Sequence, residues 1–363
     1  MISKAAIRAE AERLFGIFRA AGAVPVEADI LLPAGTLLDL YGEDIRARAY
    51  VTQDPIRGEM MLRPDFTVPV VQAHMQHGAD PARYCYLGEV FRAQEHLDDR
   101  PSEYLQVGFE IFDRANPEAA DAEVFALFRD ALHPLDLRAV TGDIGILMAA
   151  VRGLETTDRR KDALLRHVWR PRRFRALLDR FSGRAPEPAA RRRLLDRLAA
   201  DTPQALIAAA GPLVGLRDAD EIAARANALL EDAKTPPIAA LEAAMLYDLL
   251  SLETNAAAAL THLQGISRHL PAIGPAVDRF AARLQALTER GIDPATLPFE
   301  ASHGRSAMEY YDGFVFSFLA GELPVASGGR YDALTAVLGQ GRSIPAVGGI
   351  LRPHLVAAMK GAL

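Results

Sequence analysis

The feature that most constrains the fold is a pair of strand-like segments with a polar loop between them. Residues 84–91 form a largely apolar run that ends at Arg92, and residues 104–112 alternate large apolar side chains with polar residues and glycine. The loop of residues 93–101 carries His96, Asp98 and Asp99. This pattern predicts an antiparallel hairpin inside a larger sheet.

Three residues of the second segment share one face of the predicted sheet: Gln106, Gly108 and Glu110. Two interpretations remain open from spacing alone, because such a face lines a binding site in one protein and is solvated in another. Arg92 is equally ambiguous. Its forked donors suit an anionic ligand, but an arginine at the end of a strand also forms structural ion pairs.

Five segments in order resemble the histidine-site motifs of class II histidyl-tRNA synthetases. These are LRPDFT from Leu62, FRAQ from Phe91, the strand with Gln106 and Glu110, EYYDGFVF from Glu309, and SGGRYDAL from Ser327. The order and length of the motifs make the resemblance specific. It implies an α+β fold of the class II aminoacyl-tRNA synthetase type, in which a mainly antiparallel sheet is flanked by helices and interrupted by a helical insertion.

The resemblance also implies a set of residues that bind histidine. Asp65, Thr67 and Gln106 would hold the amino group, Arg92 the carboxylate, and Glu110 the imidazole, while Tyr310 and Tyr311 would close over the ring. These pairings are chemically complementary. The imidazole would rest against Gly328 and Gly329, which we expect to begin a tight turn, although a turn that merely joins strand to helix has the same sequence.

The sequence departs from the synthetase pattern where ATP chemistry takes place. Ser306 stands where the family has an arginine, with Arg305 one residue away and aimed at the opposite face if the segment is a strand. Leu355 replaces the ATP-binding arginine of motif 3, Arg352 is out of register, and Gln94 replaces a motif 2 glutamate. Loss of such donors costs about 10²- to 10³-fold in rate each, so we expect no catalytic residues and no synthetase activity.

A histidine site without an ATP site resembles the synthetase-like regulatory subunits that accompany short-form ATP phosphoribosyltransferase. That resemblance implies a non-catalytic role in the first step of histidine biosynthesis and in its feedback regulation. It also implies three partners: the short catalytic subunit, histidine as effector, and a second copy in a homodimer within a hetero-oligomer. The alternatives are a truncated synthetase paralogue that activates histidine or another amino acid with ATP, through Arg305 or Arg352, and a scaffold with a lapsed pocket.

We predict a core domain of residues 1–157 and 275–363, a mainly helical insertion of residues 158–274, and no anticodon-binding domain. The insertion carries a basic run: Arg159, Arg160, Lys161, Arg166, Arg170, Arg172, Arg173, Arg175, Arg191, Arg192 and Arg193. Interleaved aspartates favour solvated helix faces with ion pairs over a nucleic-acid surface, although a partner or a phosphate ligand could use it. The balance of 41 basic to 47 acidic residues likewise argues against nucleic acid.

Composition bears on membrane attachment, on the role of the single cysteine and on metal binding. No apolar run approaches the length of a membrane span, and the N-terminus predicts an amphipathic helix rather than a signal peptide, so we expect a cytoplasmic protein without membrane attachment. The single Cys85 is interpreted as a core residue. His74 and His77 have helical spacing but no evident third ligand, so neither a metal nor another cofactor is expected.

Overall fold

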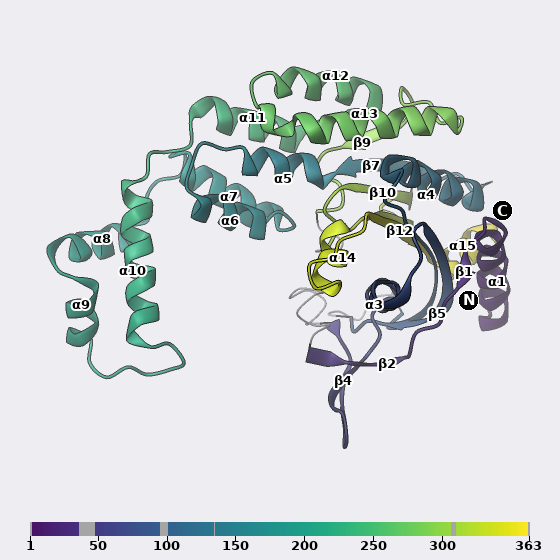
Figure 1. Cartoon of the computed structure of the whole chain (residues 1–363), viewed down its shortest axis with the longest axis horizontal. Helices are drawn as coiled ribbons and strands as arrows, with labels where there is room; N and C mark the ends of the chain where they lie inside the picture. Colours follow the sequence, from purple (N-terminus) through teal and green to yellow (C-terminus); the bar gives the residue numbers. More distant parts are fainter. Residues whose placement is uncertain (1, 36–47, 95–100, 134, 306–309, 362–363) are drawn as a thin grey trace. The chain divides into compact units, whose positions relative to one another are not determined.

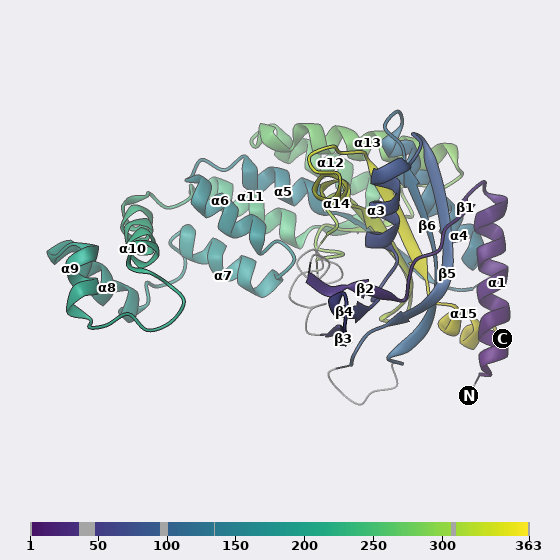
Figure 2. The ribbon, with the colours of Figure 1, turned by 60° about the horizontal axis from the view of Figure 1, so that its bottom comes forward.

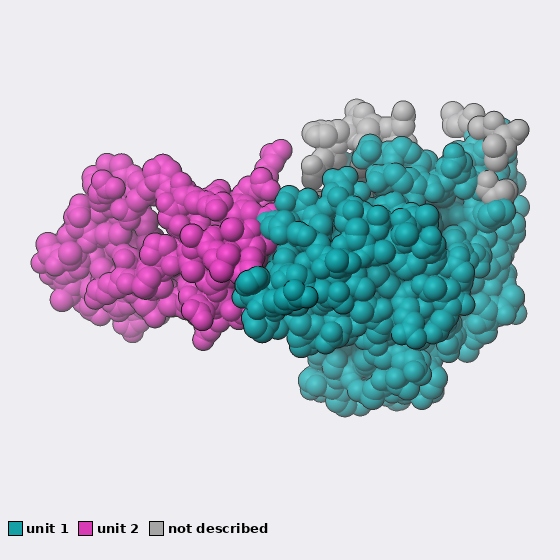
Figure 3. Space-filling view, turned by 90° about the horizontal axis from the view of Figure 1, so that it is seen from above, with its two compact units in different colours: residues 1–150, 248–363 teal, residues 151–247 magenta. Residues whose placement is uncertain are grey.

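The computed structural model describes residues 2–35, 48–94, 101–133, 135–305 and 310–361. Two compact units divide the chain: the first comprises residues 1–150 and 248–363, and the second comprises residues 151–247 (Figure 3). The predicted insertion of residues 158–274 differs from the second unit chiefly at its end. Residues 248–274 belong to the first unit because β8 pairs with β9 of the large sheet and helix α12 packs on α13.

The strands of the first unit are β1 (Val24–Pro25), β2 (Leu31–Pro33), β3 (Val51–Asp54), β4 (Gly58–Leu62), β5 (Ala82–Phe91), β6 (Glu103–Phe112), β7 (Arg138–Asp143), β8 (Glu253–Asn255), β9 (Pro298–Glu300), β10 (Phe314–Ala320), β11 (Leu323–Arg330) and β12 (Ala346–Leu351). Nine of them form one sheet in the order β1-β5-β6-β12-β11-β10-β7-β9-β8, and β2-β4-β3 form a second. The large sheet is antiparallel except for the β1–β5 and β7–β9 pairs. This confirms the predicted fold class.

The helices of the first unit are α1 (Lys4–Ala20), α3 (Thr67–His77), α4 (Pro117–Leu132), α12 (Ala256–Ser267), η1 (Pro271–Ile273), α13 (Gly274–Glu289), α14 (Asp332–Leu338) and α15 (Pro353–Lys360). Helices α3 and α14 lie on one side of the central strands, and α1 and α4 lie on the other (Figures 1 and 2). The α3 side is hereafter the site face.

The main core fills the space between the sheet and α1 and α4. Phe18 of α1 packs against Phe109 of β6 and Phe128 of α4, and Phe125 and Phe128 of α4 meet Phe316 of β10. All five rings are buried. Because Phe109 points to this core, its neighbours Gly108 and Glu110 point to the site face.

The second unit is helical, as its composition predicts. It contains α6 (Asp158–Arg166), α7 (Pro171–Phe181), α8 (Ala189–Ala200), α9 (Pro203–Ala209) and α10 (Ala219–Lys234), while α5 (Ile144–Arg152) and α11 (Ala240–Ser251) cross its boundaries. Two arginines of the basic run form ion pairs with Asp232, Arg160 at 2.6 Å and Arg191 at 2.7 Å. Arg160 is buried rather than solvated, and it also donates to three backbone carbonyls.

Other predictions about local structure have mixed outcomes. The predicted hairpin is confirmed as β5 with β6. Within the EYYDGFVF motif, strand β10 begins at Phe314, and residues 306–309 lie outside the described part. The expectation of a turn at Gly328 and Gly329 is wrong, because both residues lie inside β11 and pair with Gly349 and Gly348 of β12.

Cys85 and His74 are core residues. Burial raises the pKa of the Cys85 thiol to about 11, as expected for a structural thiol. His74 stacks on Phe112 with ring centroids 3.8 Å apart, and burial lowers the pKa of its imidazole. Within the described ranges, no three His, Cys, Asp or Glu side chains are arranged to hold a metal ion, and no helix has the length and apolar character needed to cross a membrane.

Candidate functional site

The site is built around the carboxylate of Glu110, in the middle of β6. Three hydroxyl groups donate hydrogen bonds to it: Thr67 Oγ1 to Oε1 at 3.2 Å, Tyr86 to Oε1 at 2.9 Å and Tyr331 to Oε2 at 2.6 Å. Glu110 is 1% exposed. The solvated-face interpretation of this strand is therefore wrong, and the polar face of β6 is an interior polar network.

Burial is the largest influence on this carboxyl group. It raises the pKa of Glu110 to about 7, although the hydrogen bonds from Tyr331, Tyr86 and Thr67 oppose the rise. Burial likewise raises the pKa of the Tyr86 and Tyr331 hydroxyls well above their usual value, and the negative Glu110 adds to the effect. The tyrosines therefore stay protonated and act as donors. A carboxylate offers about four lone-pair positions, so three donors leave room for one more.

A glycine in the adjacent strand makes space for this arrangement. Gly348 of β12 lies directly opposite Glu110, and a Cβ added at Gly348 would overlap Glu110 Oε2. The same principle operates at Gly329 of β11, where a Cβ would meet the Tyr311 ring at 2.8 Å and the Phe314 carbonyl oxygen at 2.6 Å. Side chains of the site thus occupy the places that non-glycine residues would fill.

The loop that precedes α3 supplies a second part of the site. Asp65 Oδ1 accepts a hydrogen bond of 3.1 Å from the backbone N–H of Thr67, the first residue of the helix. A carboxylate is favourable there because the N-terminus of a helix carries partial positive charge. Phe66 stacks on Tyr86 with centroids 4.4 Å apart, which fixes this loop against β5.

Arg92 leaves the end of β5 and turns back toward the same loop. Its Nε donates to the Pro64 carbonyl oxygen at 2.9 Å, and Nη2 lies 3.9 Å from Asp65 Oδ2. Arg92 therefore forms a structural ion pair with Asp65, although the distance between their charged atoms is long. The pair lies beside the Glu110 network, because Asp65 bonds to Thr67 and Thr67 bonds to Glu110.

Two tyrosines complete the predicted set. The Tyr310 hydroxyl donates to Thr67 Oγ1 at 3.4 Å, and the Tyr310 and Tyr311 rings meet edge to face with centroids 4.9 Å apart. Both side chains are buried. Gln106 is buried on the same face, opposite Gly88, and its Oε1 has no hydrogen-bond partner in the part of the chain that the structure describes.

The structure therefore brings Asp65, Thr67, Arg92, Glu110 and Tyr310 into one connected cluster, with Tyr311 against it. Sequence reasoning missed Tyr86 and Tyr331, although Tyr86 stands in the predicted strand of residues 84–91 and Tyr331 in the SGGRYDAL motif. Tyr86 could have been found from alternation, because a strand register that places Gly108 opposite residue 86 puts both on the site face.

The residues that depart from the synthetase pattern are partly described. Leu355 and Pro353 lie in α15, and Arg352 is the residue before its first turn. Ser306 lies outside the described residues. Arg305 lies in a turn segment rather than a strand and is 3% exposed, so the direction argued for it on a strand does not apply.

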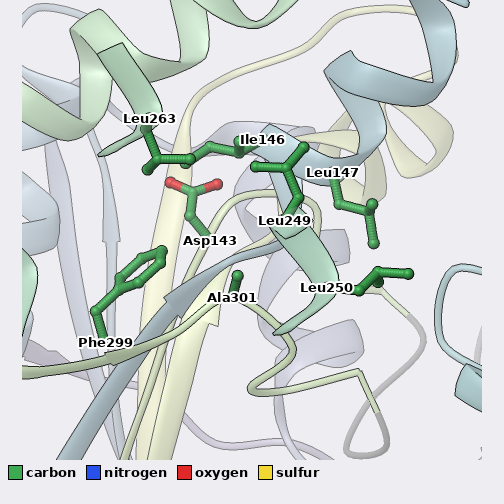
Figure 4. Close-up of a pocket in the computed structure, with 8 residues that line it drawn as sticks. All are labelled: Asp143, Ile146, Leu147, Leu249, Leu250, Leu263, Phe299 and Ala301. Carbon is green, nitrogen blue, oxygen red and sulfur yellow. The ribbon is translucent and has the colours of Figure 1, made fainter. Parts of the chain in front are cut away.

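Several hollows lie elsewhere in the first unit, and titratable residues contribute to their lining. A cavity of about 10 Å³, large enough for about one water molecule, is lined by seven apolar residues and Asp143 (Figure 4). An open pocket of about 410 Å³ is lined by ionisable residues that include Asp121, Asp312 and Arg330. Two of its arginines are paired within the protein, Arg330 with Asp121 at 2.7 Å and Arg283 with Asp143 at 2.5 Å, which indicates a structural role for these two charges.

Together, the antiparallel sheet and the polar network on its site face define a class II synthetase-like protein of the histidyl-tRNA synthetase type. Residues 3–236 and 222–354 match the family model described as Histidyl-tRNA synthetase. A solved structure from Bacillus halodurans C, described as an ATP phosphoribosyltransferase regulatory subunit/histidyl-tRNA synthetase, superposes with a TM-score of 0.68 and 20% identity, covering 98% of this chain and 78% of that chain. A histidine–tRNA ligase subunit from Alicyclobacillus acidocaldarius gives a TM-score of 0.59 and 23% identity, covering 98% and 93%. At these identities the likeness shows the fold.

Sequence relatives identify the family within this class. Proteins named ATP phosphoribosyltransferase regulatory subunit are 33% identical in Allorhizobium ampelinum, covering 91% of this chain and 92% of the relative, and 32% identical in Mesorhizobium japonicum, covering 92% of each. The chain belongs to the family of ATP phosphoribosyltransferase regulatory subunits.

Proposed function

We propose that this protein is a non-catalytic regulatory subunit of short-form ATP phosphoribosyltransferase, and that it responds to histidine bound at the Glu110 network. Family membership supports the regulatory role in histidine biosynthesis. The observation that carries the choice of ligand is the buried Glu110 carboxylate, held by three hydroxyl donors beside Asp65, Thr67 and Arg92.

Each end of a histidine molecule has a complementary group in this cluster. The imidazole N–H would donate to Glu110, the ammonium group to Asp65 and Thr67, and the carboxylate would accept from Arg92. Gln106 would add an amide acceptor, since its buried Oε1 has no hydrogen-bond partner among the described residues. Tyr310 and Tyr311 would cover the ring. A ligand without an imidazole would leave buried polar groups unpaired, which is a strong source of selectivity.

Loss of synthetase activity is the second part of the proposal. Adenylation requires fixed cations around the phosphoryl group, and this chain has Leu355 and Gln94 where the synthetase pattern has charged residues. One observation favours the competing function, activation of an amino acid with ATP. Arg352 lies close enough to Arg92 for the positive charge of Arg92 to lower the pKa of Arg352. A histidine-dependent exchange of pyrophosphate into ATP would be the signature of that enzyme.

Regulation would act through linkage between histidine and the short catalytic subunit, with this chain dimeric in the complex. If histidine prefers one arrangement of the complex, it increases the population of that arrangement by its difference in affinity. Calorimetry with histidine, on the isolated chain and on the complex, tests the ligand. Saturable binding without pyrophosphate exchange supports the proposal, and exchange at a synthetase rate contradicts it. Absence of binding in both preparations would leave a scaffold.

A further inference from the structure

The strand register places the side chain of Arg352 on the site face of the sheet. Strand β12 pairs with β6 so that Gly348 lies opposite Glu110, Ile350 opposite Gly108 and Leu351 opposite Val107. Continuing this register by one residue places Arg352 opposite Gln106. Residues directly opposite each other in an antiparallel pair share a face. The backbone N–H of Arg352 also donates to the Val325 carbonyl oxygen at 3.0 Å, so the residue still follows the line of the sheet.

The guanidinium of Arg352 is anchored to strand β11. Its Nη1 donates to the Pro324 carbonyl oxygen at 2.8 Å. Burial lowers the pKa of Arg352, while Tyr104 and Tyr311 raise it and the positive charge of Arg92 lowers it. Tyr104 is itself packed edge to face against His354, with centroids 5.5 Å apart. Arg352 and Arg92 thus approach the same region from β12 and β5, the two neighbours of β6.

Positive charge at this place exceeds the negative charge that the protein provides. Asp65 lies 3.9 Å from Arg92, whereas no carboxylate of the described residues lies within 4 Å of the Arg352 guanidinium. A partly buried guanidinium without a counter-ion is costly. Its planar fork matches a carboxylate, so an anionic ligand would lower that cost.

We infer that Arg352 binds, together with Arg92, the carboxylate of the amino acid held at the Glu110 network. The inference rests on the proposed function and adds a residue to its site. Glu110 and Gln106 are four residues apart, ~13 Å along the strand, a span that histidine and an extended arginine side chain can bridge together. Arg352 therefore discriminates between ligands with and without a carboxylate.

The test compares histidine with histamine, which keeps the imidazole and the amine but has no carboxylate. Calorimetry is performed on the full-length wild type and on Arg352→Gln, Arg352→Lys and a control, Arg57→Gln, whose exposed arginine pairs with Asp54 on the β3–β4 turn. We expect Arg352→Gln to weaken histidine binding by about 10- to 100-fold and to leave histamine binding within about twofold. Arg352→Lys should lie between, and Arg57→Gln should bind both ligands as wild type does.

Three results would overturn the inference. An equal loss of histidine and histamine affinity in Arg352→Gln would assign Arg352 a purely structural role. If Arg352→Gln binds histidine normally but loses binding of inorganic pyrophosphate, the anion that Arg352 binds is a phosphate and not the carboxylate. If Arg352→Gln does not fold, the wild type alone still tests the inference. Binding of histidine no more tightly than histamine by the wild type would overturn it. A wild type that binds no histidine, alone or in the complex, refutes the proposed function instead.

Discussion

The Tyr331 hydroxyl donates a hydrogen bond of 2.6 Å to Glu110 Oε2, which joins the residue before α14 to the centre of β6. These residues are 221 positions apart in the sequence and both are 1% exposed. The bond lies opposite the two donors to Oε1, from Thr67 and Tyr86. It fixes the carboxylate in one orientation, with its free lone-pair position available to a ligand.

Glu110 should make stability depend on pH. Burial raises the pKa of its carboxyl group from 4.5 to about 7 in the folded protein, so the folded state retains a proton that the unfolded state has lost between these values. Stability therefore falls as pH rises from 4.5 to 7, by about 3 kcal/mol at most, and is constant above pH 7 as far as this group is concerned.

Urea unfolding of wild type and Glu110→Gln between pH 5 and pH 8 measures this dependence. The difference between the two free energies of unfolding isolates Glu110, because Asp312, whose pKa burial also raises to about 7, contributes equally to both. We expect the wild type to lose stability relative to the variant as pH rises. Parallel pH profiles would show that Glu110 is ionised throughout.

Removal of the Tyr331 hydroxyl should weaken the network without disturbing its packing. Tyr331→Phe deletes a donor that lowers the pKa of Glu110, so the pH at which stability becomes constant should move upward. The cost at pH 7.5 should be about 1–3 kcal/mol, as for a hydrogen bond to a charged group. Tyr50→Phe, at a more exposed tyrosine, is the control and should change neither quantity. Equal effects of both substitutions would contradict the role given to Tyr331.

A methyl group at Gly348 should displace the Glu110 carboxylate. The added Cβ overlaps Oε2, and the Phe109 carbonyl oxygen lies 2.6 Å away on the same side, so the strand cannot simply shift. We expect Gly348→Ala to cost about 1–3 kcal/mol in the free energy of unfolding and to abolish histidine binding. Gly16→Ala is the matched control, because Gly16 lies within α1 with no atom near its added Cβ. It should be neutral or stabilising. A Gly348→Ala variant that binds histidine normally would refute this geometry.

The strand pair at the site could be predicted from sequence, because alternation and the long polar loop are local features. The ligand-side residues followed from the resemblance, which places Glu110 and Thr67 together although they come from a strand and a helix. Which hydroxyls hold Glu110 could not be predicted in the same way. Tyr86 and Tyr331 meet it only through the register of β5 with β6 and the position of α14, and register depends on the whole sheet.

The errors have a physical reason as well. Gly328 and Gly329 suggested a turn because consecutive glycines are common in turns, yet here they let Phe316 and Tyr311 approach the sheet closely. The basic run lies on exposed or half-buried helix faces, as predicted, except that Arg160 is buried because Asp232 and three carbonyl oxygens from a distant segment surround it. Such long-range compensation leaves no trace in local composition.

A buried ion-pair network on the opposite face of the sheet should be important for stability. Asp121 accepts from Arg330 at 2.7 Å and lies 3.6 Å from Arg283, with all three side chains nearly inaccessible. Asp121→Ala leaves two buried arginines with less compensation, so we expect a loss of about 3–5 kcal/mol in the free energy of unfolding. Asp130→Ala removes an exposed pair with Arg129 and should cost less than about 1 kcal/mol. If Asp121→Ala lowers the free energy of unfolding no more than the Asp130→Ala control does, solvent reaches this network.

The most direct test reconstitutes the catalytic reaction. The short ATP phosphoribosyltransferase subunit from the same organism is assayed alone, with this protein, and with its Glu110→Gln variant, each with and without histidine. We predict that the wild type binds the catalytic subunit and increases its rate, and that histidine suppresses that rate. The Glu110→Gln variant should still activate the catalytic subunit but should have lost most of the response to histidine. A catalytic subunit that neither binds this protein nor changes its rate, together with formation of histidyl-adenylate by this protein alone, would contradict it.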